Sequence, residues 1–152
     1  MKLLFPGSFD PFTIGHADLV ERALAFADSI VIGIGVNSGK KSMFTLQERL
    51  DRIGAFYARE PRVEVCSYDG LTMDFMRETG AGAILRGVRT VSDFEGEKVL
   101  ADANLKIGGA DTLLLVSKPE FQYVSSSVVR ELFSYGRSVD DMVISTFKSG
   151  LK

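Results

Sequence analysis

Five short apolar runs alternate with helical patterns along the chain, and this alternation restricts the fold more than any other feature. The runs occupy residues 2–5, 29–36, 62–68, 81–87 and 111–117. Residues 29–36, SIVIGIGV, are apolar almost throughout, which is typical of a parallel strand covered on both faces. Strands that alternate with helices are joined by right-handed crossovers. We therefore expect an α/β fold, with a five-stranded parallel sheet and helices on both faces.

The segments between these runs carry apolar residues at helical spacing. Thr45 and Glu48 form a capping box that opens a helix ending at residue 57. Ser92 and Glu95 predict a second capping box, opening a helix that ends near residue 105. Further helices are expected over residues 17–26, 71–78, 127–135 and 139–151.

Composition limits the classes of function. The chain has 152 residues, of which 45% are hydrophobic, and we expect a single domain over 1–152. A net charge of -2 argues against sequence-independent binding of nucleic acid. Cys66 has no second cysteine to pair with, and one cysteine with one histidine leaves no structural zinc site. We find no apolar run long enough for a membrane span and no signal peptide, so we expect a cytoplasmic protein.

Polar residues follow the ends of the apolar runs. Lys40 and Lys41 follow the second run, Arg86 lies near the end of the fourth and Arg89 just after it, and Lys118 follows the fifth. The carboxyl ends of parallel strands meet at one edge of the sheet, where helix N-termini add backbone N–H groups. These cations should therefore gather at one edge, and the sequence predicts a phosphate-binding site there.

The only histidine, His16, lies in the segment FPGSFDPFTIGH that follows the first run. We expect it at or beside the start of a helix, where an imidazole can donate a hydrogen bond to a phosphate oxygen. Gly15 leaves room for a ligand, and Thr13 offers a hydroxyl that can cap the turn. Asp10 is interpreted as capping the loop and not as a metal ligand.

Two motifs near opposite ends of the chain carry a resemblance. TIGH at 13–16 resembles the T-x-G-H signature of the nucleotidylyltransferase superfamily, and VSSSVVR at 124–130 is similar to its second signature. The segments at 40–49, 85–89 and 93–97 look like those of the bacterial phosphopantetheine adenylyltransferase family. The resemblance covers essentially the whole chain. It implies a Rossmann-like nucleotidyltransferase fold and a homohexamer.

The same resemblance implies a reaction in which ATP and 4'-phosphopantetheine give dephospho-coenzyme A and pyrophosphate. His16 would stabilise charge at the α-phosphate, and Lys40 and Arg86 would hold the acceptor phosphate. These three are the expected catalytic residues, with Lys41 as an alternative to Lys40. Ser8 would lie near both substrates, and Thr72 would contact the pantetheine arm.

The residues that the resemblance assigns to ATP come from four segments. They are Ser8, Phe9, His16, Gly87, Val88, Arg89, Glu97, Phe121, Gln122, Tyr123, Val124, Ser125, Ser126 and Ser127. Arg130 belongs to the second signature without an assigned contact. No acidic cluster dedicated to a metal is apparent, so Mg²⁺ is expected to arrive with ATP.

Two alternatives remain open. One is a related adenylyl- or cytidylyltransferase with another phosphorylated acceptor, and the other is a nucleotide-binding regulatory module without activity. His16, Lys40, Arg86 and Ser126 argue against the second, because they are the groups that the transfer would use.

Overall fold

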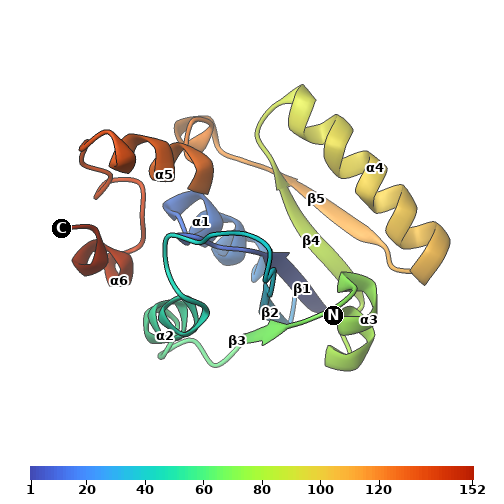
Figure 1. Cartoon of the computed structure of the whole chain (residues 1–152). Coiled ribbons are helices and arrows are strands. Elements are labelled where there is room, and N and C mark those ends of the chain that lie inside the picture. The colour runs from blue at the N-terminus through green and yellow to red at the C-terminus, as the bar shows by residue number, and fades with distance from the viewer.

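The computed structural model describes residues 1–152 and confirms the predicted fold class. Its five parallel strands lie in the order β3-β2-β1-β4-β5 (Figure 1). Their bounds are β1 Lys2–Gly7, β2 Ser29–Gly35, β3 Val63–Tyr68, β4 Ala83–Val88 and β5 Thr112–Val116. Each strand overlaps one of the five apolar runs. The hydrophobic pattern alone therefore located the sheet.

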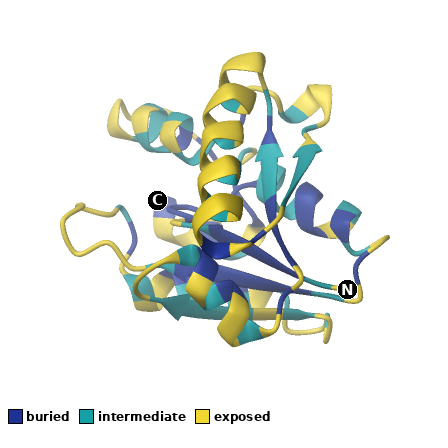
Figure 2. Ribbon diagram, turned by 90° about the vertical axis from the view of Figure 1, so that its right-hand side faces the viewer, coloured by how far each residue is buried: buried dark blue, intermediate teal, exposed yellow.

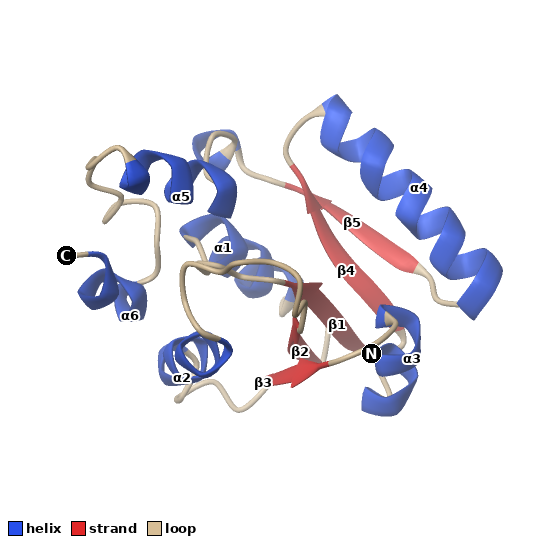
Figure 3. Ribbon diagram, in the orientation of Figure 1, coloured by secondary structure: helices blue, strands red, loops and turns tan.

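Helices cover both faces of this sheet (Figure 3). Those on one face are α1 (Ile14–Ala23), α2 (Leu46–Phe56), α5 (Ser126–Ser134) and α6 (Ser145–Lys148), and those on the other are α3 (Thr72–Thr79) and α4 (Val91–Gly108). Short 3₁₀ turns span Pro119–Phe121 and Ser149–Leu151.

The order of the strands reverses at the centre of the sheet. β1 pairs with β2 over six residues on one side and with β4 on the other. Ligands of open parallel sheets bind beyond the carboxyl ends of the strands at such a reversal. Here α1 and α4 start from those ends. Gly87 allows α1 to pack closely on β4, since a Cβ at this position would overlap Leu19.

Two apolar clusters hold the layers together. The larger has 21 buried residues and joins β1, β2 and β4 to the face that carries α1 and α2. Ile30, Ile32 and Ile34 alternate along β2 toward this cluster, while Val31 joins the smaller cluster around α3. A strand buried on both faces needs such continuous hydrophobicity, which explains why residues 29–36 are apolar almost throughout.

Helix α4 differs from the others because much of its apolar surface is exposed. It faces the viewer in Figure 2, and Val91, Val99 and Ile107 are 76%, 68% and 74% exposed. No helix of the chain combines the length and the apolar character that crossing a membrane requires.

Two expectations about helices are wrong. Ser92 and Glu95 do not form a capping box: Thr90 caps α4 instead, accepting from the Asp93 N–H at 3.1 Å. The tail over 139–151 is not one helix, because only the short α6 and the final 3₁₀ turn form there. Val143 pairs with Thr13 in an isolated antiparallel bridge and is buried in a non-helical segment. The capping box of Thr45 and Glu48 is confirmed.

Packing of the tail on α2 predicts a large loss of stability on truncation of Phe147. Its ring is fully buried and meets Phe44 edge-on, with ring centroids 5.0 Å apart. Phe147→Ala should lower the free energy of unfolding by about 3–5 kcal/mol, measured by urea denaturation. Phe26→Ala is the matched control, because Phe26 is 53% exposed. Equal losses in the two variants would contradict this packing.

Candidate active site

A cavity of about 560 Å³ opens beyond the carboxyl ends of β1 and β4, at the reversal of strand order. It is lined by 22 residues, which come from the β1–α1 loop, α1, β4, α4 and the segment before α5. Eleven predicted site residues line it: Ser8, Phe9, His16, Arg86, Gly87, Arg89, Glu97, Phe121, Val124, Ser125 and Ser126. The structure thus brings the two signatures to one cavity.

Thr13 and His16 bind each other in a reciprocal cap at the start of α1. The His16 N–H donates to the Thr13 hydroxyl at 3.3 Å, and the Thr13 N–H donates to His16 Nδ1 at 3.0 Å. The imidazole therefore takes the place that glutamate holds in an ordinary capping box. Because Nδ1 accepts a backbone hydrogen bond, the neutral ring carries its proton on Nε2. His16 is thereby prepared to donate from Nε2 to an anion in the cavity.

The surroundings keep this imidazole neutral. Burial, followed by the charges of Arg86 and Arg89, lowers the pKa of His16 from 6.5 to about 3. The rings of Phe9 and Phe12 pack against it with centroids 5.1 Å away, and Phe5 lies at 6.0 Å. Apolar rings disfavour the imidazolium, and two neighbouring cations add to that effect. His16 can therefore donate a hydrogen bond at neutral pH but is a poor general acid.

The turn after β1 is held from outside by two buried charged groups. The Asp10 carboxylate accepts from the N–H groups of Met43 and Phe44 at 2.7 and 2.8 Å, so it caps the segment before α2 and not, as the sequence had suggested, its own loop. Arg49 is 8% exposed and donates from Nη1 to the Ser8 carbonyl at 2.7 Å. These bonds fix the backbone of the turn, so that Ser8 stays exposed at the rim of the cavity.

The second signature binds the turn that leads into the first. Ser126 donates its hydroxyl hydrogen to the Pro11 carbonyl at 2.7 Å, and Arg130 donates to the Asp10 carbonyl at 2.8 Å. Arg130 also lies 3.3 Å from the Ser127 hydroxyl. The arginine of this signature therefore has a positioning contact, which sequence reasoning left unassigned.

Arg86 and Glu97 form a bidentate pair. Nε and Nη2 of the guanidinium donate to the two carboxylate oxygens at 2.8 and 2.6 Å, and Nη1 donates to the Pro6 carbonyl at 2.9 Å. A guanidinium has five N–H donors, so two remain for a phosphate. The expected contact of Glu97 with the nucleotide stays a prediction, since this carboxylate is bound to Arg86 in the structure.

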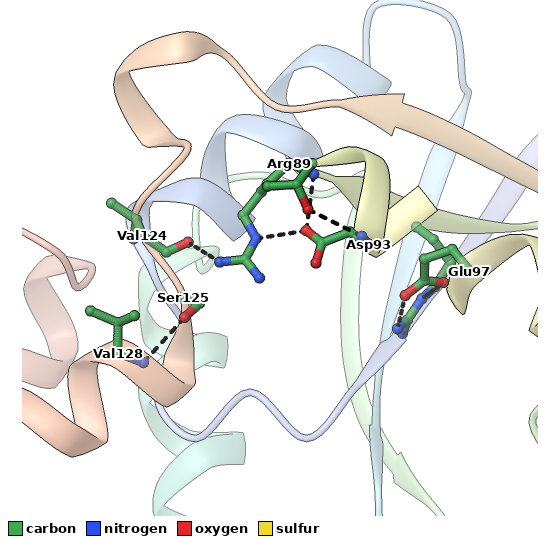
Figure 4. A network of polar contacts seen from close by, with 8 residues as sticks. Arg89, Asp93, Glu97, Val124, Ser125 and Val128 are labelled. Atoms are coloured by element: carbon green, nitrogen blue, oxygen red, sulfur yellow. Dashed lines mark hydrogen bonds and ion pairs between the residues drawn. The ribbon is translucent and has the colours of Figure 1, made fainter. Parts of the chain in front are cut away.

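Arg89 reaches across the cavity toward α5 (Figure 4). Its Nε and its backbone N–H both donate to Asp93 at 3.1 Å, and Nη1 lies 3.5 Å from the Val124 carbonyl. Ser125 caps α5 by accepting from the Val128 N–H at 3.1 Å (Figure 4). Sequence reasoning gave no role to Asp93 or Arg49. Both are charged residues within segments that carry the family resemblance, at 40–49 and 93–97, and nothing else in the sequence marks them as functional.

The expected acceptor residues lie in two smaller cavities beside the main one. Lys40 and Lys41 line a cavity of about 210 Å³ that shares Ser8 with the main cavity. Thr72 lines another of about 130 Å³, which shares Arg86 and Glu97 with it. Both lysines are exposed, so the structure leaves the choice between them open.

Four residues predicted to bind ATP do not line the main cavity: Val88, Gln122, Tyr123 and Ser127. Their assignment stays a prediction from the resemblance. Val88 is buried and Tyr123 is 56% exposed.

No group of three or more His, Cys, Asp or Glu side chains is placed to hold a metal ion. The acidic side chains that line the main cavity, Asp93 and Glu97, are already bound to arginines.

The depressed pKa of His16 predicts that its imidazole does not titrate between pH 5 and 8. Because the chain has one histidine, its ring resonances can be followed by NMR without assignment. In urea the same ring should titrate near the ordinary value of about 6.5. The unfolded chain then takes up a proton that the folded chain refuses, so this group lowers stability as pH falls from about 6.5 to about 3. A folded-state midpoint near 6.5 would contradict the description of the site.

Comparisons with known proteins agree with this architecture. Residues 4–132 match the model of the Cytidylyltransferase-like family. The chain is 50% identical to the phosphopantetheine adenylyltransferase of Porphyromonas gingivalis, over 92% of each chain. It is 50% identical to that of Bacteroides fragilis, over 91% of this chain and 92% of the other, and 48% identical to that of Leuconostoc citreum, over 88% and 84%.

Among solved structures, a bifunctional NMN adenylyltransferase/ADP ribose pyrophosphatase from Francisella tularensis superposes with a TM-score of 0.72. The match covers 99% of this chain and 47% of the other at 17% identity, which supports the fold alone. The matches to the three adenylyltransferases show more than the fold, because their identity is 48–50% over most of the chain. Together with the two signatures at one cavity, they show that the chain belongs to the phosphopantetheine adenylyltransferase family, within the Cytidylyltransferase-like proteins.

Proposed function

We propose that the chain transfers the adenylyl group of ATP to 4'-phosphopantetheine, giving dephospho-coenzyme A and pyrophosphate. Identity of 50% over 92% of the chain to a phosphopantetheine adenylyltransferase is the observation that carries this proposal. The site supports it, because a neutral hydrogen-bond donor and two arginines line one cavity. Two smaller cavities beside it offer room for a second substrate.

The chemistry needs little from a general base. The acceptor is a phosphate monoester whose second pKa is about 6, so it is already a dianionic nucleophile at neutral pH. Its oxygen attacks the α-phosphorus of ATP, and the bond from that phosphorus to the pyrophosphate oxygen breaks. Repulsion between two anions is the main obstacle. Catalysis then depends on positioning and on donors placed where charge develops.

Each residue in the proposal has a role that suits its surroundings. His16 donates from Nε2 to an α-phosphate oxygen, with Nδ1 held by Thr13. Arg86 offers its two remaining N–H groups to the acceptor phosphate, and Lys40 approaches from the neighbouring cavity. Ser8 lies at the rim that the main cavity shares with that of Lys40.

Mg²⁺ enters the proposal as a companion of ATP, whose charge it partly neutralises when bound. The protein residues do not supply a ligand set of their own, because Asp93 and Glu97 pair with arginines and Asp10 accepts two backbone N–H groups. No step of the reaction is therefore assigned to a protein-held metal ion.

Release of pyrophosphate by the purified chain tests the reaction. ATP with 4'-phosphopantetheine should give turnover, while CTP with the same acceptor or ATP with nicotinamide mononucleotide should give at most about 1% of that rate. Turnover with another acceptor only would replace this proposal by the alternative of a related adenylyl- or cytidylyltransferase. Binding of ATP without any turnover would favour the regulatory module.

We further propose that six copies assemble and that the protein works in the cytoplasm, where a free thiol such as Cys66 stays reduced. Exposed apolar side chains on α4, among them Val91, Val99 and Ile107, support an interface between copies. Light scattering of the purified chain should give six times its mass of 16.6 kDa. A mass of 16.6 kDa at micromolar concentration would overturn the assembly.

A further inference from the structure

Asp18, two residues beyond His16 on α1, binds two cations at once. Its side chain is 7% exposed, and Oδ1 lies 2.8 Å from Lys118 Nζ. Oδ2 accepts from Arg22 Nη1 at 3.2 Å. The same Nη1 donates to the Val116 carbonyl at 2.9 Å. One carboxylate on α1 thus holds the last residue of β5 through Arg22, and it binds Lys118, two residues beyond the strand, directly.

Lys118 lies near the start of a stretch that closes one side of the main cavity. We define the covering segment as residues 117–126; Ser117, Phe121, Val124, Ser125 and Ser126 of this segment line the cavity. The Lys118 carbonyl accepts from the Phe121 N–H at 3.0 Å, so the ion pair sits at the base of the turn that carries Phe121. A Cβ on Gly15 would lie 3.9 Å from Phe121 Cβ, which places this turn beside the start of α1.

The rest of the covering segment has few anchors. Apart from that of the Ser117 N–H, its backbone–backbone bonds are local, such as the Val124 N–H to the Phe121 carbonyl at 3.0 Å. The Ser117 N–H joins the segment to β4, Arg89 reaches the Val124 carbonyl at 3.5 Å, and Ser126 binds Pro11. Between Ser117 and Val124, the polar link to the body of the protein is the ion pair of Lys118 with Asp18.

We propose that Asp18 and Lys118 are positioning residues, which hold the covering segment on α1 and so set the affinity for the nucleoside triphosphate. Neither side chain lines the main cavity, so both act through the segment. A segment that is ordered before binding spares the ligand the entropic cost of ordering it. Hydrogen bonding to Asp18 raises the pKa of Lys118, as expected for an ammonium held by a carboxylate. This inference rests on the proposed function only in taking ATP as the nucleotide.

Calorimetry of ATP binding to the full chain tests this role. Lys118→Met and Asp18→Asn should each raise the Kd for ATP about tenfold, or about 1.4 kcal/mol. The double variant should bind no more weakly than Asp18→Asn alone, because that variant has already lost the ion pair that Lys118→Met removes. Lys118→Arg should stay within about threefold of the wild type, since it keeps the charge.

Kinetics separate positioning from a merely structural role. In Lys118→Met the KM for ATP should rise while kcat stays within about twofold, which is the pattern of lost uniform binding. The Kd for 4'-phosphopantetheine should not change, because the covering segment does not line the cavities of Lys40 and Thr72. If the ion pair were merely structural, Lys118→Met would lower the melting temperature and would weaken the binding of both substrates alike.

Lys98→Met is the matched control, because Lys98 pairs with Asp102 at 2.6 Å on the exposed side of α4. ATP affinity as strong in Lys118→Met as in Lys98→Met, or additive losses in the double variant, would overturn the inference. Lys118 is 46% exposed, so its variants decide the question even if Asp18→Asn fails to fold. Wild-type protein that binds no ATP would overturn the proposed function itself, whereas tight binding by every variant would overturn this inference alone.

Discussion

The hydrogen bonds between Thr13 and His16 cap the start of α1 and at the same time orient the imidazole at the site. The Thr13 N–H occupies Nδ1, and this places the imidazole proton on Nε2 at the cavity. Three phenyl rings and two arginines then lower the pKa of the ring to about 3. A donor that stays neutral and fixed suits a reaction between two anions, because it stabilises developing charge by a hydrogen bond without transferring its proton.

The surroundings of this donor come from parts of the chain that are distant in sequence. Ser126 and Arg130 bind the carbonyls of Pro11 and Asp10, so the late signature is fastened to the turn that leads into the early one. Arg49 holds the Ser8 carbonyl from the opposite side. In each case a polar side chain satisfies a carbonyl of the same turn. The turn after β1 is therefore the common support of both signatures, and the reversal of strand order leaves space above it.

Much of this arrangement could be predicted from the sequence because its signals are local. Apolar runs located all five strands, and Thr13 could be recognised as a residue able to cap the turn, although the helix was expected from residue 17 and begins at Ile14. The predicted N-cap of α4 was wrong because Thr90 and Ser92 both precede an acidic residue by three positions. The choice between them depends on where β4 ends, which is at Val88. The pairing of Arg86 with Glu97 depends on how α4 packs on β4. No spacing pattern in one sequence contains that information.

The kinetics and ATP affinity of His16→Ala test the central claim most directly. If His16 stabilises charge that develops in the transition state, kcat should fall about 10²–10³-fold while the Kd for ATP stays within about tenfold. If ATP affinity falls as far as kcat, His16 serves to bind the ground state. The account of a neutral donor prepared for the transition state would then be contradicted.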